Sequence, residues 1–255
     1  METLKKFSEA VEAYVRPETY PVALKMLKKK ADIPEGIKTA QERLGVMIAL
    51  CQAWGKVRFN GESSAMLKED ISCPIALFTL GLADPPATWS EGNLYLNWYT
   101  SSQKAAENLA SAMYKLPKGE FIGVAMSPIR DCNFEPDVVV IYCTPPQIMR
   151  FIVAALMREG GRFENSIFPP GVCTEVIAPV MQTGKCRFGI PCFGDRKYEY
   201  TAEDELVFSV PFSRLEEIAE GLKFFYEHGH GLPLSRPLDH ASAQLETYKK
   251  LRAIL

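Results

Sequence analysis

Four of the seven cysteines in this sequence stand beside signals for a turn or for the end of a helix. They are Cys51 in "LCQAW", Cys73 in "SCPIA", Cys173 in "GVCTEV" and Cys192 in "PCFGDR". Thiolates bind zinc, copper(I) and iron–sulfur clusters, and four of them suffice for a tetrahedral zinc ion or a cubane cluster. Pro74 fits the first turn of a helix, which places Cys73 near an N-cap where the helix dipole favours a thiolate.

The spacing of these four cysteines contains no local metal motif. No pair forms C-x-x-C, so only the fold could bring together residues as distant as Cys73 and Cys173. One alternative is that each is a packing residue, because free cysteine is among the most buried residue types. Another is a thiol enzyme in which Cys192, beside Arg196, is a nucleophile of lowered pKa.

The composition and net charge of the chain limit the kinds of molecule that the protein can be expected to bind. The 255 residues are 47% hydrophobic and 24% charged, which is typical of a globular protein with a substantial core. A formal net charge of -2 provides no broad basic surface, so we expect no nucleic-acid partner. No apolar run is long enough for a signal peptide or a membrane span, so we expect a cytoplasmic protein with no membrane partner. Structural disulfides are rare in that compartment.

The N-terminal portion, residues 1–118, reads mainly as helices. Apolar periodicity predicts a helix over residues 42–56, with Cys51 in its last third. The aromatic stretch "NLYLNWYTS" at residues 93–101 indicates either an interface or core packing. Strands are predicted at residues 22–27 and 63–70, and further helices at residues 4–15 and 101–116.

The remaining portion, residues 119–255, repeats one order of elements. Two predicted strands precede a helix at residues 144–161, and two more precede a helix at residues 213–228. These units predict a single α+β domain over residues 1–255, in which a pseudo-duplicated strand-loop-strand-helix sheet follows the helical N-terminal portion. Two unrelated units that merely look alike are the alternative. A last helix is predicted from near Asp239 or Ser242.

Six sequence blocks follow one another in a specific order between about residues 20 and 225. They are "YPVALKML", "CQAWGKVRFNG", "SCPIALFTLGL", "FEPDVVVIYCTPPQIMRFIVAALMREGGR", "GVCTEVI" and "PCFGDR". This order resembles an uncharacterised family of anaerobic bacteria and archaea, catalogued as domain of unknown function one hundred and sixty-nine (DUF169). The resemblance implies that the ligand set is Cys51, Cys73, Cys173 and Cys192, rather than Cys132, Cys143 or Cys186. It implies no reaction, and a further family cysteine near the position of Asp195 is absent here, which leaves the number of ligands open.

We predict an iron–sulfur cluster of the 4Fe–4S type, with zinc as the less favoured content. Family members come largely from anaerobes, where oxygen-labile clusters persist, and small structural zinc sites use paired cysteines that this chain lacks. In the turn after Cys192, Gly194 would let main-chain N–H groups approach sulfur. Arg196, oriented by Asp195, would place a positive charge beside the cluster or a substrate. An offset of 66 residues between the two repeated units would bring Arg130 to the other side of the same cleft. The alternative for this turn is a surface salt bridge.

The predicted function is a redox, electron-transfer or cluster-dependent accessory role. The partner would be a redox protein or a small-molecule substrate, and an oligomer is compatible with the sequence. Two alternatives stay open: a metal-free protein that binds a small molecule in an arginine-lined cleft, and the thiol enzyme using Cys192. The sequence identifies no catalytic residues and leaves open whether the protein is an enzyme.

Overall fold

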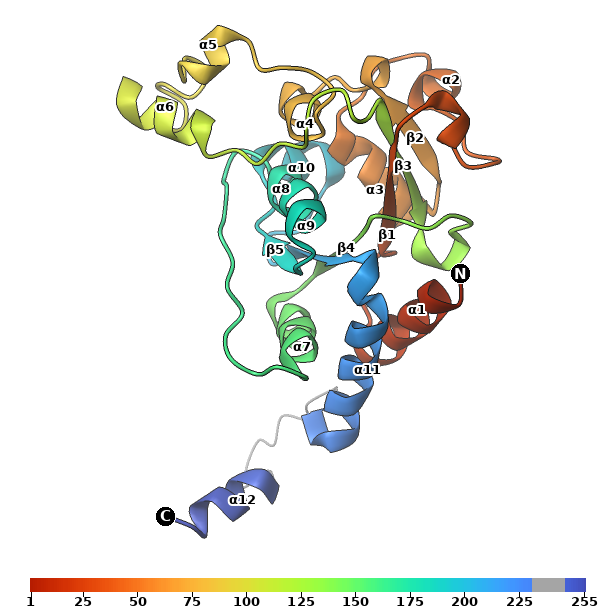
Figure 1. The fold of residues 1–255 in the computed structure, drawn as a ribbon, viewed down its shortest axis with the longest axis vertical. Helices are drawn as coiled ribbons and strands as arrows, with labels where there is room; N and C mark the ends of the chain where they lie inside the picture. The colour runs from red at the N-terminus through yellow and green to blue at the C-terminus, as the bar shows by residue number, and fades with distance from the viewer. Residues whose placement is uncertain (231–245) are drawn as a thin grey trace.

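A computed structural model of the chain describes residues 1–230 and 246–255 (Figure 1). Within these residues, six antiparallel strands form one sheet in the order β2-β3-β1-β4-β6-β5. The strands are β1 (Val22–Leu27), β2 (Ser64–Leu67), β3 (Gly123–Pro128), β4 (Val138–Cys143), β5 (Arg187–Gly189) and β6 (Leu206–Pro211). The predicted α+β class is confirmed.

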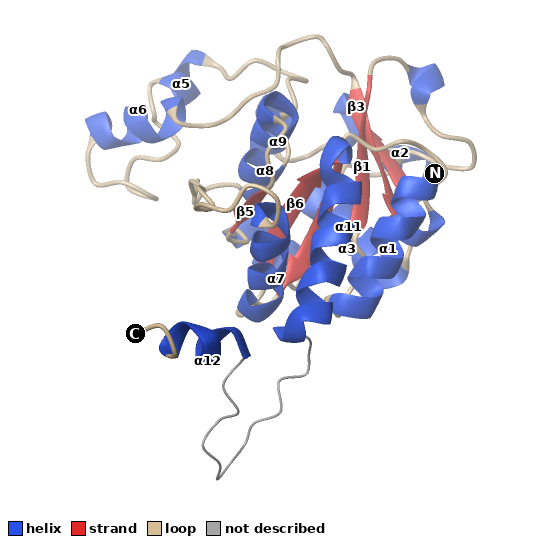
Figure 2. Cartoon of the chain, turned by 60° about the horizontal axis from the view of Figure 1, so that its bottom comes forward, coloured by secondary structure: helices blue, strands red, loops and turns tan. Residues whose placement is uncertain are grey.

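One face of the sheet is covered by three helices, which Figure 2 shows in front of the strands. They are α1 (Glu2–Tyr14), α7 (Pro145–Leu156) and α11 (Leu215–Phe225). Their apolar sides pack on Val139, Ile141 and Cys143 of β4. We call this side of the sheet the packing face.

The opposite face carries α3 (Leu50–Asn60), α8 (Val172–Val176) and α9 (Ala178–Thr183). Trp54 and Val176 of these helices pack on Val138, Val140 and Tyr142 of β4. We call this side the cavity face. Because helices cover both faces, β4 is apolar at every position, which explains its continuous run "VVVIYC".

A smaller apolar core lies beside the cavity face, where α4 (Pro74–Thr79), α5 (Ala87–Ser90) and α6 (Gln103–Ser111) pack around Phe78, Trp89 and Tyr95. Figure 1 shows α5 and α6 at the edge of the molecule, away from α1 and α11. The remaining described elements are α2 (Ala40–Leu44), α10 (Phe193–Glu199), α12 (Glu246–Arg252), the 3-10 turns η1 (Lys30–Asp32), η2 (Lys68–Asp70), η3 (Ile129–Asp131) and η4 (Phe212–Arg214), and the π turn η5 (Tyr226–His230).

Two local predictions around the cysteines are wrong. The helix predicted over residues 42–56 is two helices, because Gly45 adopts a left-handed conformation with φ 68° and ends α2. Cys51 therefore lies in the first turn of α3 rather than in the last third of a helix. The predicted turn after Cys192 is the start of α10, with Cys192 itself as the N-cap.

The two repeated units share one sheet, as expected, but the first unit is divided. β1 of the N-terminal portion lies between β3 and β4, whereas β5 and β6 pair directly. The N-terminal portion thus supplies a central strand as well as helices. The predicted start of the last helix lies outside the described residues, which resume at α12.

Candidate functional site

The four cysteines singled out in the sequence line one cavity of about 620 Å³ on the cavity face. Each comes from a separate helix N-terminus. Cys51 is in the first turn of α3 and Cys173 in that of α8, while Cys73 and Cys192 are the N-caps of α4 and α10. Helix N-termini carry unpaired N–H groups and favour negative charge, so this arrangement suits thiolates.

Backbone pairing between the segments that precede α3 and α4 brings Cys51 and Cys73 together. The N–H of Ile48 donates to the carbonyl of Asp70, and the N–H of Ser72 donates to the carbonyl of Ile48, each at 3.0 Å. The two cysteines follow these paired segments within a few residues. A short parallel β-bridge between Ile48 and Ile71 holds the two segments side by side.

Two glycines bring α8, and with it Cys173, close to its neighbours. A Cβ at Gly171 would lie 2.8 Å from Ile75 Cγ2 of α4, and one at Gly189 of β5 would lie 2.7 Å from Val172 Cγ2. Neither position has room for a side chain, so α8 can pack between α4 and β5. Cys192 lies three residues after the end of β5, which brings the third and fourth cysteines to the same cavity.

Gly194 lies where the sequence predicted main-chain N–H groups near sulfur. A Cβ there would be 3.7 Å from Cys192 Sγ and 3.9 Å from Cys51 Sγ, so both sulfurs lie close to this glycine. The backbone N–H groups of Val172, Gly194 and Asp195 lower the pKa of the Cys192 thiol. Gly194 does this from within α10 and does not adopt a left-handed backbone.

Burial controls the protonation of these thiols. It raises the pKa values of Cys51, Cys173 and Cys192, and the Asp195 carboxylate raises each of them further. At Cys192 the three N–H groups oppose this rise. The thiols therefore favour the neutral form until a cation displaces their protons, as metal binding to cysteine requires.

The two arginines predicted to share a cleft lie apart from the cavity. Arg196 donates to the carbonyl of Ala202 at 2.8 Å, and Arg130 stacks on Tyr20, with its guanidinium carbon 3.9 Å from the ring centre. Neither is among the residues that line the thiol cavity. Arg130 instead lines a second cavity, beside α1.

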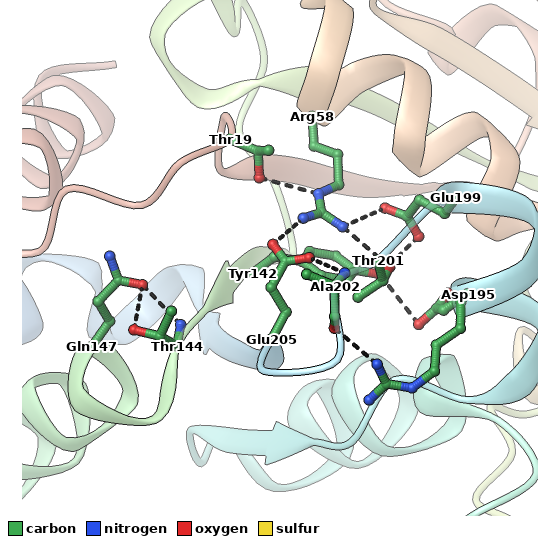
Figure 3. A network of polar contacts seen from close by, with 11 residues as sticks. Thr19, Arg58, Tyr142, Thr144, Gln147, Asp195, Glu199, Thr201, Ala202 and Glu205 are labelled. Atoms are coloured by element: carbon green, nitrogen blue, oxygen red, sulfur yellow. Dashed lines mark hydrogen bonds and ion pairs between the residues drawn. The ribbon is translucent and has the colours of Figure 1, made fainter.

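Asp195 does not orient Arg196 as the sequence suggested; it belongs to a buried polar network behind the cavity (Figure 3). The hydroxyl of Tyr142 lies 3.3 Å from Asp195 Oδ2 and 3.0 Å from Glu199 Oε2 and can donate to either. Arg58 donates to Glu199 at 3.2 Å and also to Glu205. Both partners of the Arg58–Glu199 pair are completely buried.

The network contains three carboxyl groups but only one guanidinium group, that of Arg58. If all three carboxyl groups were ionised, the network would carry a net negative charge. Burial raises the pKa of Asp195 to about 7, and burial together with the Asp195 charge raises the pKa of Glu199 well above its usual range. The sequence contains one local signal for this network. The four-residue spacing of Asp195 and Glu199 places them on one side of a helix, whereas the residue types around Cys192 are typical of a turn.

The fold and the cavity define an α+β protein with four cysteines gathered at helix N-termini on one face of an antiparallel sheet. The chain belongs to the DUF169 family, described as "Uncharacterised ArCR", which matches residues 10–221. This confirms the resemblance seen in the sequence. An uncharacterized protein of Methanocaldococcus jannaschii is 26% identical over 207 residues, which cover 80% of this chain and 87% of the relative. No solved structure matches the chain significantly.

Among residues 1–230 and 246–255, no helix is both long enough and apolar enough to cross a bilayer.

Proposed function

We propose that Cys51, Cys73, Cys173 and Cys192 bind an iron–sulfur cluster of the 4Fe–4S type, and that the protein has a redox, electron-transfer or cluster-dependent accessory role. The observation that carries the proposal is that these four cysteines, far apart in the sequence, line one cavity from four helix N-termini. All seven cysteines are free, so each of the four cavity thiols is available as a ligand.

The dispersed positions of the four cysteines in the sequence favour a cluster over a single structural zinc ion, because such zinc sites use closely spaced cysteine pairs. Across residues 1–230 and 246–255, no three His, Cys, Asp or Glu side chains are grouped closely enough to hold one metal ion. Zinc needs its thiolates in mutual contact around it, at Zn–S distances of about 2.3 Å. Thiolates that bind different irons of a cluster stand further apart, because the cluster lies between them.

Backbone N–H groups near Cys192 suit the negative charge that a cluster places on a sulfur ligand. A bound cluster would supply one-electron redox chemistry. The N–H groups of Val172, Gly194 and Asp195 stabilise negative charge on the Cys192 sulfur. The electrons would come from or go to a redox partner protein or a small molecule.

Metal analysis of protein purified without oxygen tests the proposal. We expect iron and sulfide in proportion and a broad absorption band in the visible, with little zinc. Serine at Cys51, Cys73, Cys173 or Cys192 should lower the iron content, whereas Cys143→Ser, on the packing face, should leave it unchanged. Colourless, iron-free protein after reconstitution with iron and sulfide would contradict the proposal.

The same four variants count the ligands. If all four cysteines bind, the cluster is closed and suits electron transfer or sensing. If one variant keeps its iron, that position is open and one iron could act on a substrate as a Lewis acid, by the logic that separates structural from catalytic zinc.

A second candidate function is a thiol enzyme with Cys192 as nucleophile. The three N–H groups on its sulfur favour this candidate, because they stabilise a thiolate. Burial and the Asp195 carboxylate act in the opposite direction. In metal-free protein, selective alkylation of Cys192 at neutral pH, ahead of Cys51, Cys73 and Cys173, would support this candidate over the cluster.

A further inference from the structure

The thiol cavity is larger than a cluster requires. Its volume of about 620 Å³ lies within the range of roughly 300–1,000 Å³ that is usual for sites that bind small organic molecules. A cluster built on metal–sulfur bonds of about 2.3 Å would fill only a fraction of that space. The space that remains is lined by side chains with no part in holding a cluster.

Aromatic rings form a continuous part of this remaining wall. Trp89, Tyr95, Trp98 and Tyr99 come from α5 and the turns that follow it. They contact one another in series, edge to face or tilted: the ring centres of Trp89 and Tyr95 are 5.0 Å apart, those of Tyr95 and Tyr99 5.8 Å, and those of Trp98 and Tyr99 4.7 Å. Trp54 of α3 and Phe193 and Tyr198 of α10 also line the cavity.

The segment that carries the aromatic wall is packed against the rest of the protein. At Gly92, between Trp89 and Tyr95, a Cβ would lie 2.3 Å from the backbone of Ala106 in α6, so the turn packs directly on that helix. Tyr95 is buried in the smaller core, whereas the ring of Trp98 is 64% exposed at the rim. The wall therefore combines a fixed inner ring with an accessible outer one.

The charges around the cavity disfavour an anionic ligand. Among the described residues that line it there is no lysine, arginine or histidine. The acidic groups present are Asp195 and the four thiols. A carboxylate or phosphate would lose its hydration without gaining a cationic partner, which is costly.

We propose that the aromatic part of the cavity binds a planar, uncharged organic molecule, such as an aromatic ketone or a heterocycle, beside the thiols. The proposal extends the cluster function, on which it rests for the assumption that the cluster occupies the cysteine end of the cavity. Flat rings match the aromatic wall, and an uncharged molecule needs no cationic partner in the lining.

Three naphthalene probes of equal ring size separate these requirements. Calorimetric titration of the full chain, both metal-free and reconstituted, would compare 2-acetylnaphthalene with 2-naphthoate and with 2-naphthyltrimethylammonium. We expect the uncharged ketone to bind roughly tenfold or more tightly than either charged probe. Equal affinity for all three, or tighter binding of the ammonium, as in an aromatic cage for cations, would overturn the proposal.

Three variants link the binding to this wall. Trp98→Ala should weaken binding of 2-acetylnaphthalene by roughly tenfold, and Phe193→Ala, which removes a second accessible ring of the wall, by about fivefold. Phe224→Ala is the matched control, because Phe224 is an exposed aromatic residue of α11 on the packing face. Unchanged affinity in both wall variants, with circular dichroism showing native folds, would also overturn the proposal.

The two proposals fail separately. If the protein takes up no iron or sulfide but still binds the ketone in a way that depends on Trp98, the cluster proposal is wrong and the aromatic site is supported. A full complement of iron and sulfide with no ketone binding would do the reverse.

Discussion

The two sides of the sheet use cysteine in different ways. On the packing face, Cys132, Cys143 and Cys186 are between 1% and 5% exposed and lie in the apolar core formed with α1, α7 and α11. On the cavity face, Cys51, Cys73, Cys173 and Cys192 are partly exposed and surround one cavity. The residue type is the same, but its surroundings differ in exposure and in the backbone groups nearby.

This comparison shows what separates a packing cysteine from a candidate ligand. Cys132 donates to the carbonyl of Phe134 at 3.1 Å, and Cys143 ends β4 among apolar neighbours. Such thiols are protonated and already have their contacts. Burial also raises the pKa of Cys192, but three backbone N–H groups oppose that rise, which distinguishes this sulfur from the packing cysteines.

Thiol reactivity should separate the two sets most strongly. In metal-free protein, iodoacetamide should modify the four cavity cysteines roughly a hundredfold or more faster than Cys132, Cys143 and Cys186, because those three react only after the core opens. Reconstitution with iron and sulfide should protect the cavity set. Mass spectrometry of peptides would measure both effects, and denatured protein, in which all seven react alike, is the control. Equal rates in the native protein would remove the distinction between the faces.

Charge removal on the cavity face should have the next largest effect. Arg58→Met leaves Glu199 and Glu205 without their buried partner, and we expect a loss of roughly 3–5 kcal/mol in the free energy of unfolding. The control is Arg158→Met, since Arg158 pairs with Glu220 of α11 on the surface and should contribute less than about 1 kcal/mol. Urea unfolding would compare the two. A small effect at Arg58 would show that the buried carboxyls are neutral.

The pH dependence of stability should reveal Asp195. Its pKa is raised from 3.8 to about 7 by burial, so the native state holds a proton that the unfolded chain releases near pH 4. The stability from that proton is complete below about pH 4 and is lost as the pH rises through about 7.

Asp195→Asn stays neutral, so metal-free wild type should lose on the order of 2 kcal/mol relative to this variant between pH 5 and pH 8. Urea unfolding across that range measures the difference, and Asp204→Asn, at an exposed position, is the control. Parallel pH profiles for wild type and Asp195→Asn would show that Asp195 is ionised in the native state throughout.

Truncation of one cysteine from each face should produce the smallest difference in the free energy of unfolding. In metal-free protein, Cys143→Ala leaves a small void in the packing face and should cost about 1–2 kcal/mol of unfolding free energy. Cys73→Ala, at a partly exposed N-cap, should change it by about 0.5 kcal/mol or less. Thermal unfolding of the two variants measures this difference. A larger loss at Cys73 would mean that the cavity cysteines also have a structural role.

The predictability of the site differed from residue to residue. Helix-end and turn signals, together with the family resemblance, selected the four cysteines that line the cavity. The same kind of local pattern misplaced Cys51 within its helix, because apolar periodicity continued across Gly45. The 66-residue offset between the repeated units paired Arg130 with Arg196. In the structure, Arg130 of η3 stacks on Tyr20, whereas Arg196 of α10 donates to the carbonyl of Ala202.

The sequence by itself determined the strands, most helices and the small set of residues with thiol chemistry, since these depend on propensity and periodicity over a few neighbours. Only the tertiary structure decided which residues meet. Insertion of β1 between β3 and β4, and the close packing allowed by Gly171 and Gly189, brought four distant helix N-termini to one cavity. The Arg58 network arose in the same way, because contacts between residues 141 positions apart depend on strand order and leave no local signal.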